Sequence, residues 1–286
     1  MAAHPLIRAL IKAFWSVRGK SISDTLRLYG WFIFWIAEGA WVRILPGRLQ
    51  QAALTTRRKR LSRIAQREKV YLKGFGGYHD LFFYFGQKED FDVAWFQWQP
   101  GEIGLQIGAN RGGYGLLASR VIGPRGLCIA IEPNPAAYFD LLELIALNRA
   151  SNVVALPVAC GSHEGWVELE QPPGEWEDVL VRVKTSEDPR AVPLARVRLC
   201  QLNRIVEGLG LERCDFVIID VEGYEGEVLR GADAVLRRFR PRLYIEIHDT
   251  WDEIESLLRA YGYGIRAWKG NRPGRGHIWA MPEASE

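Results

Sequence analysis

The sequence predicts an α/β protein with a mostly parallel sheet covered by helices on both faces, for two reasons. From about Val70 onward, short apolar runs alternate with longer segments of helical periodicity. The first of these runs ends in the glycine-rich stretch LQIGANRGGYG, residues 105–115. In open sheets of this kind ligands bind at the carboxyl ends of the strands, so this loop marks a candidate site.

The first half of the α/β region is expected to supply five elements in order. The apolar run 101–107 predicts a buried strand, and 114–121 predicts the helix after the glycine loop. A second strand is expected at 126–132 and a helix at 135–150, where the apolar residues recur at helical spacing. The run NVVALPVAC, 152–160, predicts a third strand.

The second half begins with a Pro-rich segment, 164–198, whose alternating pattern predicts short antiparallel strands. The remaining elements follow the same alternation of apolar runs and helical periodicity. They are a helix at 199–210, a strand at 214–220, a helix at 226–239, a strand at 242–248, a helix at 250–262, and a closing hairpin formed by 263–270 and 277–281.

We assign the α/β domain to residues 70–286. Residues 1–69 differ from it in composition, and their sequence predicts a helical, aromatic and basic extension. The segment 28–46 is rich in Trp and Phe, and 55–69 carries seven basic residues against one acid. One interpretation is a helical extension that packs its aromatics on the main domain. The other is peripheral membrane contact, with Trp and Phe at the headgroup level and Lys and Arg facing anionic lipid. A transmembrane span is disfavoured because Glu38 interrupts the apolar segment.

Composition narrows the function classes further. The formal net charge of +3 is small, and nothing beyond the basic run supports nucleic-acid binding. Four cysteines without C-x-x-C spacing predict reduced thiols, and the scattered histidines match no metalloprotease motif. These features predict a cytoplasmic protein, located at the inner face of the membrane if residues 1–69 bind lipid.

The glycine loop and the next strand end predict a site for an adenosine-containing cofactor. Gly108 permits a tight turn, Gly112 is expected to permit close ligand approach, and Asn110 tolerates a left-handed backbone. Glu132 ends the second strand, where an acid accepts hydrogen bonds from ribose hydroxyls. The loop does not match G-x-G-x-x-G, which disfavours a dinucleotide, and a triphosphate-binding lysine is missing.

Acidic residues and a histidine follow two later strands. Asp220 and Glu222 end the strand 214–220, and Glu246 and His248 end the strand 242–248. Glu225 is expected to lie in the first turn of the next helix, where an acid interacts favourably with the helix dipole. Because the ends of parallel strands meet at one edge of a sheet, Asp220, Glu222, Glu246 and His248 are candidates for proton removal.

Four stretches carry a resemblance to a known family: QIGANRGGYG, IEPNP, IIDVEGYEGEVLRGA and RPRLYIEIH. In this order and spacing they resemble the FkbM family of S-adenosylmethionine-dependent methyltransferases, over about residues 100–249. The resemblance implies a class I methyltransferase fold, Rossmann-like with a C-terminal antiparallel hairpin. It also implies O-methylation of a glycan, a lipid-linked sugar or a secondary metabolite.

The resemblance also implies roles for single residues. Gln106, Gly108, Ala109, Asn110 and Gly112 would hold the methionine end of S-adenosylmethionine, and Glu132 would bind its ribose. Ala159 and Cys160 would lie near the adenine. Asp220, Glu222, Glu246 and His248 would face the acceptor.

The chain departs from the family pattern at Gln106, Ile218 and Cys200. The family usually has Asp where Gln106 stands, so we expect weaker cofactor binding than in a typical relative. These departures keep an alternative function open, a degenerate, non-catalytic scaffold at the membrane surface.

Two ways of activating an acceptor hydroxyl stay open from the sequence. His248 or Asp220 would act as general base. Alternatively, the acids would hold Mg²⁺, which makes a bound hydroxyl more acidic.

Overall fold

The structure is a computed structural model that describes residues 17–18, 21–26, 28–30, 69–72, 77–80, 96–171, 181–184, 190–272 and 274–283. It divides into two compact units, residues 1–88 with 174–179 and residues 89–173 with 180–286. The boundary predicted at residue 70 stays a prediction. None of the helices among the described residues is both long and apolar enough to cross a membrane.

The first unit contains a small antiparallel sheet. Its strands, in spatial order, are β1 (Val17–Arg18), β2 (Lys69–Leu72) and β3 (Gly77–Asp80). Residues 22–26 and 28–30 are helical. Most of residues 1–69 lie outside the described residues, so both interpretations of this extension stay predictions.

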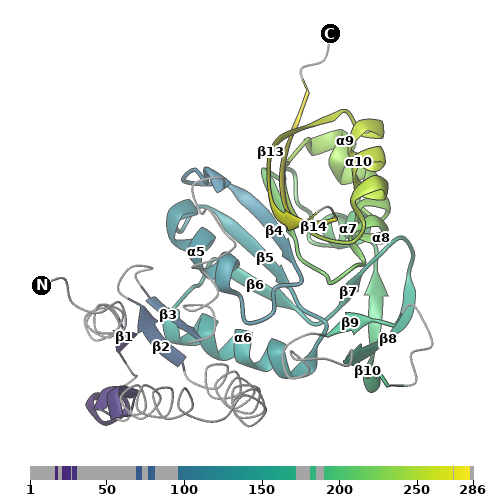
Figure 1. Ribbon diagram of the computed structural model, residues 1–286. Helices are drawn as coiled ribbons and strands as arrows, with labels where there is room; N and C mark the ends of the chain where they lie inside the picture. Colours follow the sequence, from purple (N-terminus) through teal and green to yellow (C-terminus); the bar gives the residue numbers. More distant parts are fainter. Residues whose placement is uncertain are drawn as a thin grey trace, which may run out of the picture. The chain divides into compact units, whose positions relative to one another are not determined.

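The second unit is built on a seven-stranded sheet of order β13-β14-β12-β11-β4-β5-β6 (Figure 1). From β6 to β12 the neighbouring strands pair in parallel, whereas β14 runs antiparallel to both β12 and β13. This confirms the predicted mostly parallel sheet with a C-terminal antiparallel hairpin. The strands are β4 (Ile103–Ile107), β5 (Leu127–Ile131), β6 (Val153–Leu156), β11 (Phe216–Ile219), β12 (Arg242–His248), β13 (Tyr263–Arg272) and β14 (Arg275–Pro282).

Helices cover the central strands, as the burial of those strands on both faces requires. Ile107, Ile131 and Ile219 belong to one buried cluster that also contains Val228 and Leu258 from the helices after β11 and β12. Figure 1 shows α7 to α10 grouped beside β13 and β14, and α5 and α6 beside β4 to β6. The helices are α5 (Gly113–Ile122), α6 (Pro135–Asn148), α7 (Leu202–Gly208), α8 (Glu225–Arg230), α9 (Asp233–Phe239) and α10 (Trp251–Ala260).

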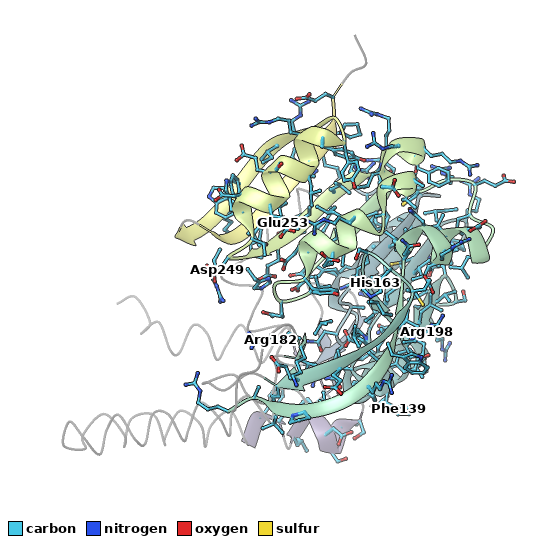
Figure 2. The ribbon with its side chains drawn as sticks, turned by 90° about the vertical axis from the view of Figure 1, so that its right-hand side faces the viewer. Phe139, His163, Arg182, Arg198, Asp249 and Glu253 are labelled. Carbon is cyan, nitrogen blue, oxygen red and sulfur yellow. The ribbon has the colours of Figure 1, made fainter. Side chains whose placement is uncertain are left out.

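A second, four-stranded sheet follows β6 in the chain and has the order β7-β10-β8-β9. It confirms the predicted antiparallel strands, because β8 pairs antiparallel with both β9 and β10. Figure 2 shows Arg182 of β9 and Arg198 of β10 in this part of the molecule. The strands are β7 (Ala159–Cys160), β8 (Gly165–Gln171), β9 (Arg182–Val183) and β10 (Val192–Cys200).

Two predicted elements were wrong in their extent. The run 152–160 is two strands in two sheets, β6 and β7, because Pro157 lacks the N–H that a continuous ladder needs. The helix predicted at 226–239 is divided into α8 and α9 at Gly231, where a side chain would overlap the carbonyl oxygen of Gly161. The four cysteines are free thiols, as predicted.

Candidate functional site

The glycine loop joins β4 to α5 and lies against the end of β11. Gly108 has φ +75°, and a Cβ there would overlap the backbone carbonyl of Asp220. The Gly108 and Ala109 amides donate to the carbonyl oxygen of Ile131, at 3.0 and 2.8 Å, which ties the loop to β5 as well. The loop backbone is therefore held between the carboxyl ends of β5 and β11, the two strands on either side of β4.

Gly112 is required for packing, which the sequence did not indicate. It has φ +78°, and a side chain there would overlap Leu141 of α6. The structure thus gives a reason for this glycine other than the predicted close approach of a ligand. Asn110 does adopt the left-handed conformation that was expected, with φ +48°.

Gln106 supports the loop from inside the protein. Its side chain is buried, its Oε1 accepts a hydrogen bond from the Gly115 amide at 2.7 Å, and its Nε2 donates to the Ala109 carbonyl at 3.5 Å. The amide group therefore joins the loop to the first turn of α5. Gln106 supplies the acceptor oxygen that was expected, without a negative charge.

Glu132 ends β5 and is buried beneath the loop. Its Oε2 accepts from the Asn110 amide at 2.6 Å, and its Oε1 accepts from the Asn134 amide at 2.8 Å. Burial raises the pKa of Glu132 to about 7, although these two hydrogen bonds and the charge of Arg111 lower it. A carboxylate has about four lone-pair sites, so both oxygens retain acceptor capacity for hydroxyl groups.

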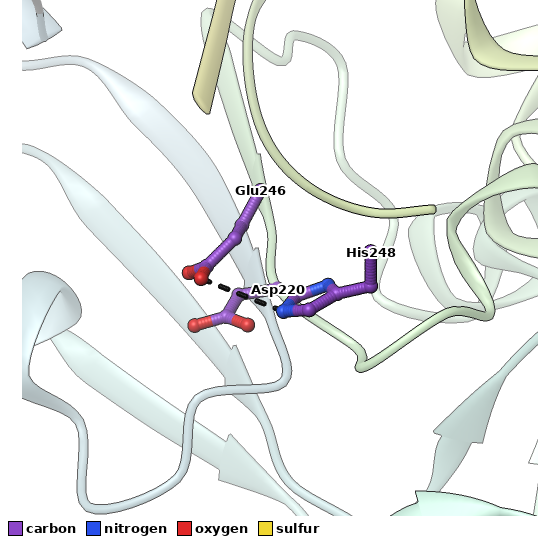
Figure 3. Close-up of side chains that lie close together, drawn as sticks. All are labelled: Asp220, Glu246 and His248. Atoms are coloured by element: carbon purple, nitrogen blue, oxygen red, sulfur yellow. Dashed lines mark ion pairs between the residues drawn. The ribbon is translucent and has the colours of Figure 1, made fainter. Parts of the chain in front are cut away.

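Asp220, Glu222, Glu246 and His248 meet at the carboxyl ends of β11 and β12, as the parallel topology predicts. His248 Nε2 lies 3.2 Å from Glu222 Oε2 and 3.4 Å from Glu246 Oε1. Figure 3 shows the carboxyl of Asp220 beside Glu246 and His248. One ligand atom each from Asp220, Glu246 and His248 lies within 4.8 Å of the others.

Two further members of this cluster were missed in the sequence. Glu225 lies in the first turn of α8, as expected, but its side chain is fully buried and its Oε1 lies 2.8 Å from His248 Nδ1. His277 is buried on β14, directly opposite Glu246, with Nδ1 3.9 Å from Glu246 Oε2. Glu225 lies in the DVEGYE stretch, which was a usable signal, but the pairing of His277 depends on the register of the hairpin.

The close approach of these groups shifts their pKa values. Burial lowers the pKa of His248, but its hydrogen bonds to Glu225 and Glu246 and the charges of Glu222 and Asp220 outweigh burial and raise it to about 11. Burial, followed by the negative charges of Glu246 and Glu222, raises the pKa of Asp220 well above its usual value. At neutral pH His248 therefore carries a positive charge among the carboxyls.

The backbone around the cluster is also unusual. Asn110, Glu222 and Asp249 are non-glycine residues with positive φ, of +48°, +54° and +62°, and each follows the end of a central strand. Left-handed conformations cost free energy in such residues and concentrate at functional sites. In Figure 2, Asp249 lies at the start of the segment that leads to α10 and Glu253.

The structure places Ala159 and Cys160 in β7, outside the seven-stranded sheet. Both are buried, and β7 pairs with the end of β10 so that Cys160 lies opposite Cys200. Burial raises the pKa of the Cys160 thiol, so this cysteine is not a ready nucleophile. Their contact with the adenine of a cofactor stays a prediction.

Comparisons with known proteins match the part of the chain that contains the glycine loop and the acid cluster. The family model of the methyltransferase FkbM domain matches residues 106–265, from Gln106 into β13. The methyltransferase sdnD of Sordaria araneosa is 31% identical over 194 residues, which cover 56% of this chain and 73% of sdnD. The AMB antimetabolite synthetase AmbE of Pseudomonas aeruginosa is 28% identical over 208 residues, 58% of this chain and 10% of AmbE.

Two solved structures are similar in part. An FkbM methyltransferase from Methylobacillus flagellatus aligns with a TM-score of 0.46 and 16% identity, over 64% of this chain and 43% of that one. Aeropyrum pernix fibrillarin, with bound S-adenosyl-L-methionine, aligns with a TM-score of 0.42 and 18% identity, over 64% of this chain and 67% of that one. The chain thus spans less than half of the first structure and a tenth of AmbE.

Proposed function

The chain belongs to the FkbM methyltransferase family, and from this premise we propose that it transfers a methyl group from S-adenosylmethionine to a hydroxyl oxygen. The proposed acceptor is a glycan, a lipid-linked sugar or a secondary metabolite. The observation that carries the proposal is the direct packing of Gly108 against Asp220, which brings the cofactor loop and the acid cluster together.

The residues of the loop suit S-adenosylmethionine. Glycine at 108 and 112 keeps the loop backbone in place, because side chains there would overlap Asp220 and Leu141. The carboxyl group of Glu132 lies at the end of the neighbouring strand and retains acceptor capacity for the ribose hydroxyls. When bound, S-adenosylmethionine supplies a methyl group on a sulfonium, which is a good leaving group.

Asp220 is the proposed general base. It lies directly beside the cofactor loop, whereas His248 already holds a proton and directs both ring nitrogens at carboxyl groups. A hydroxyl is a weak nucleophile, and a carboxylate with a raised pKa accepts its proton more readily than an ordinary one. The chain's remaining task is to align the acceptor oxygen behind the methyl group.

A second mode of activation rests on the gathering of Asp220, Glu246 and His248. Oxygen ligands suit Mg²⁺, so Asp220 and Glu246 would hold the ion, and it would make a bound hydroxyl more acidic. Activity measured after treatment with EDTA separates the two modes. Loss of transfer that Mg²⁺ restores supports the metal mode, and unchanged transfer supports Asp220 acting alone.

Oxygen is preferred over nitrogen as the acceptor atom for a reason of family resemblance. The [DNS]-P-P-[YF] motif of many amino-group methyltransferases does not follow β11, where this chain has Asp-Val-Glu-Gly at 220–223. A relative named as an antimetabolite synthetase supports a secondary metabolite among the acceptor classes, although the match covers a tenth of that protein.

Calorimetry with S-adenosylmethionine tests this function against the alternative of a non-catalytic scaffold. We expect the wild type to bind, and Glu132→Ala to abolish binding because the ribose loses its acceptor. A folded wild-type protein that binds no S-adenosylmethionine would overturn the proposal. Incubating cell extract with the labelled cofactor then shows whether label enters lipid, polysaccharide or small molecules.

A further inference from the structure

We propose that Glu225 is a positioning residue of the active site, which hydrogen-bonds His248 Nδ1 and holds the imidazole in a fixed orientation opposite Glu222 and Glu246. Its role in turnover rests on the proposed methyltransferase function. Its effect on the imidazole does not, so the two are tested separately.

Glu225 is held in place by donors from three segments of the chain. Its Oε1 accepts from the Gly223 amide at 2.9 Å and from His248 Nδ1 at 2.8 Å, and its Oε2 accepts from Thr250 Oγ1 at 2.8 Å. The side chain is completely buried. It therefore joins the loop after β11 to the end of β12 and to the start of α10.

This contact fixes the chemistry of the imidazole. Both carboxyl oxygens of Glu225 already act as acceptors, Oε1 from the Gly223 amide and Oε2 from Thr250, so the proton in the contact with His248 belongs to Nδ1. The ring is then oriented with Nε2 toward Glu222 Oε2 and Glu246 Oε1, at 3.2 and 3.4 Å. A histidine is commonly oriented in this way by a carboxylate behind it, and the carboxylate decides which nitrogen faces the reacting groups.

The position of Glu225 has a consequence for Asp220. Asp220, Glu222 and Glu246 follow or end two adjacent strands, and the His248 imidazole lies among their carboxyl groups. If the charge of Glu225 is removed, His248 loses its strongest partner, and the arrangement of the carboxyls around the acceptor changes. The binding of S-adenosylmethionine at the glycine loop should be preserved, since Glu225 does not contact that loop in the described part of the chain.

A purely structural role for Glu225 is the competing explanation, because removing any buried, hydrogen-bonded acid destabilises a protein. Glu102 offers a matched control. It is also buried, and it binds Arg242 through both carboxylate oxygens at the opposite, amino-terminal ends of β4 and β12. Glu102→Ala therefore removes a buried acid that bridges two parts of the same sheet without touching the acid cluster.

The experiment compares full-length wild type, Glu225→Gln, Glu225→Ala and Glu102→Ala. The amide of Glu225→Gln keeps an acceptor oxygen for Nδ1 but loses the charge, whereas Glu225→Ala loses both. We expect kcat to fall at least about tenfold in Glu225→Ala, with partial recovery in Glu225→Gln and no change in the KM for S-adenosylmethionine. We expect Glu102→Ala to lower stability and leave kcat of the folded fraction unchanged.

The second readout is the ¹⁵N and ¹H nuclear magnetic resonance of the histidine side chains, which needs no turnover. We expect the wild type to show a slowly exchanging, strongly hydrogen-bonded Nδ1 proton for His248, identified by its loss in His248→Asn. This resonance should disappear in Glu225→Ala and persist in Glu102→Ala.

Two results would overturn the proposal: a kcat for Glu225→Ala equal to that of Glu102→Ala, or an Nδ1 resonance that survives in Glu225→Ala. If the wild type transfers no methyl group to any acceptor, the proposed function fails, and the resonance alone decides whether Glu225 positions His248.

Discussion

At Gly108 the absence of a side chain allows the cofactor loop to lie against the end of β11. This position requires glycine for two independent reasons. Its φ is +75°, and a Cβ there would overlap the Asp220 carbonyl. Substitution should therefore move the loop itself, and with it the distance between the cofactor and the acid cluster.

The variant Gly108→Ala tests this directly. We expect it to lose measurable binding of S-adenosylmethionine in calorimetry, because the loop backbone must shift. Gly210→Ala is the matched control, since Gly210 has φ +63° but open space around its Cβ position. It should cost only the strain of a left-handed alanine, about 1 kcal/mol of unfolding free energy, and keep full binding. Equal binding by the two variants would refute this account of the loop.

At Glu132 the raised pKa predicts a pH dependence of cofactor binding. Burial raises this pKa to about 7, so the carboxylate proposed to accept the ribose hydroxyls is mostly present at pH 8 and mostly protonated at pH 6. Affinity should therefore weaken as pH falls, by up to about tenfold between pH 8 and pH 6.

The variant Glu132→Gln separates the titration of Glu132 from that of the ligand, because the ligand's own groups titrate equally with both proteins. At pH 8 the variant should bind S-adenosylmethionine more weakly than the wild type. Its affinity should not fall further between pH 8 and pH 6. Calorimetry at pH 8 and pH 6 measures the affinity of each protein for S-adenosylmethionine. If the affinity falls equally in wild type and variant, a group other than Glu132 causes the pH dependence.

At the scale of elements, the ion pair of Glu102 and Arg242 joins the starts of β4 and β12, two strands that are separated by β11. Arg242 Nη2 lies 2.8 Å from Glu102 Oε2, and the Glu102 side chain is 8% exposed. Breaking a buried pair by removing one partner leaves an uncompensated charge. We therefore expect Glu102→Ala to lower the unfolding free energy by about 3 kcal/mol in a urea titration. A change below about 0.5 kcal/mol would show that the pair behaves as an exposed one.

The elements differ in how far the sequence predicts them. The strand predicted at 242–248 has the observed bounds of β12, where Leu243, Ile245 and Ile247 recur at every second position, the period of a strand. The division at Gly231 depends on the carbonyl of Gly161, a contact between distant parts of the chain that local periodicity does not contain. The separation of β7 from β6 likewise depends on pairing with β10.

The same distinction applies to the site. Asp220, Glu222, Glu246 and His248 were found because each follows a strand end, and parallel topology brings those ends together. Glu225 and His277 were missed because their roles depend on where a side chain turns and on the register of β14 against β12. Gln106 appeared as a departure from a family pattern, and the structure gives it a specific partner, the Gly115 amide.

At the scale of the whole molecule, the methyltransferase fold and residues 1–69 pose separate questions. The site lies entirely within the second unit, so its chemistry can be tested without assigning a role to the extension. From the Trp-rich and basic segments we predict co-sedimentation of the full chain with anionic vesicles, lost on deletion of residues 1–69. The truncated protein must still bind S-adenosylmethionine, as a check of its folding. Equal sedimentation of both proteins would remove the membrane interpretation.

Methyl transfer itself shows whether Asp220 completes an O-methyltransferase site beside the glycine loop. Wild type and Asp220→Asn are each incubated with cell extract and S-adenosylmethionine labelled in its methyl group. The account predicts label in a product of the wild type, and at least about a hundredfold less with Asp220→Asn, although both proteins bind the cofactor equally. Equal transfer by the two proteins would contradict it.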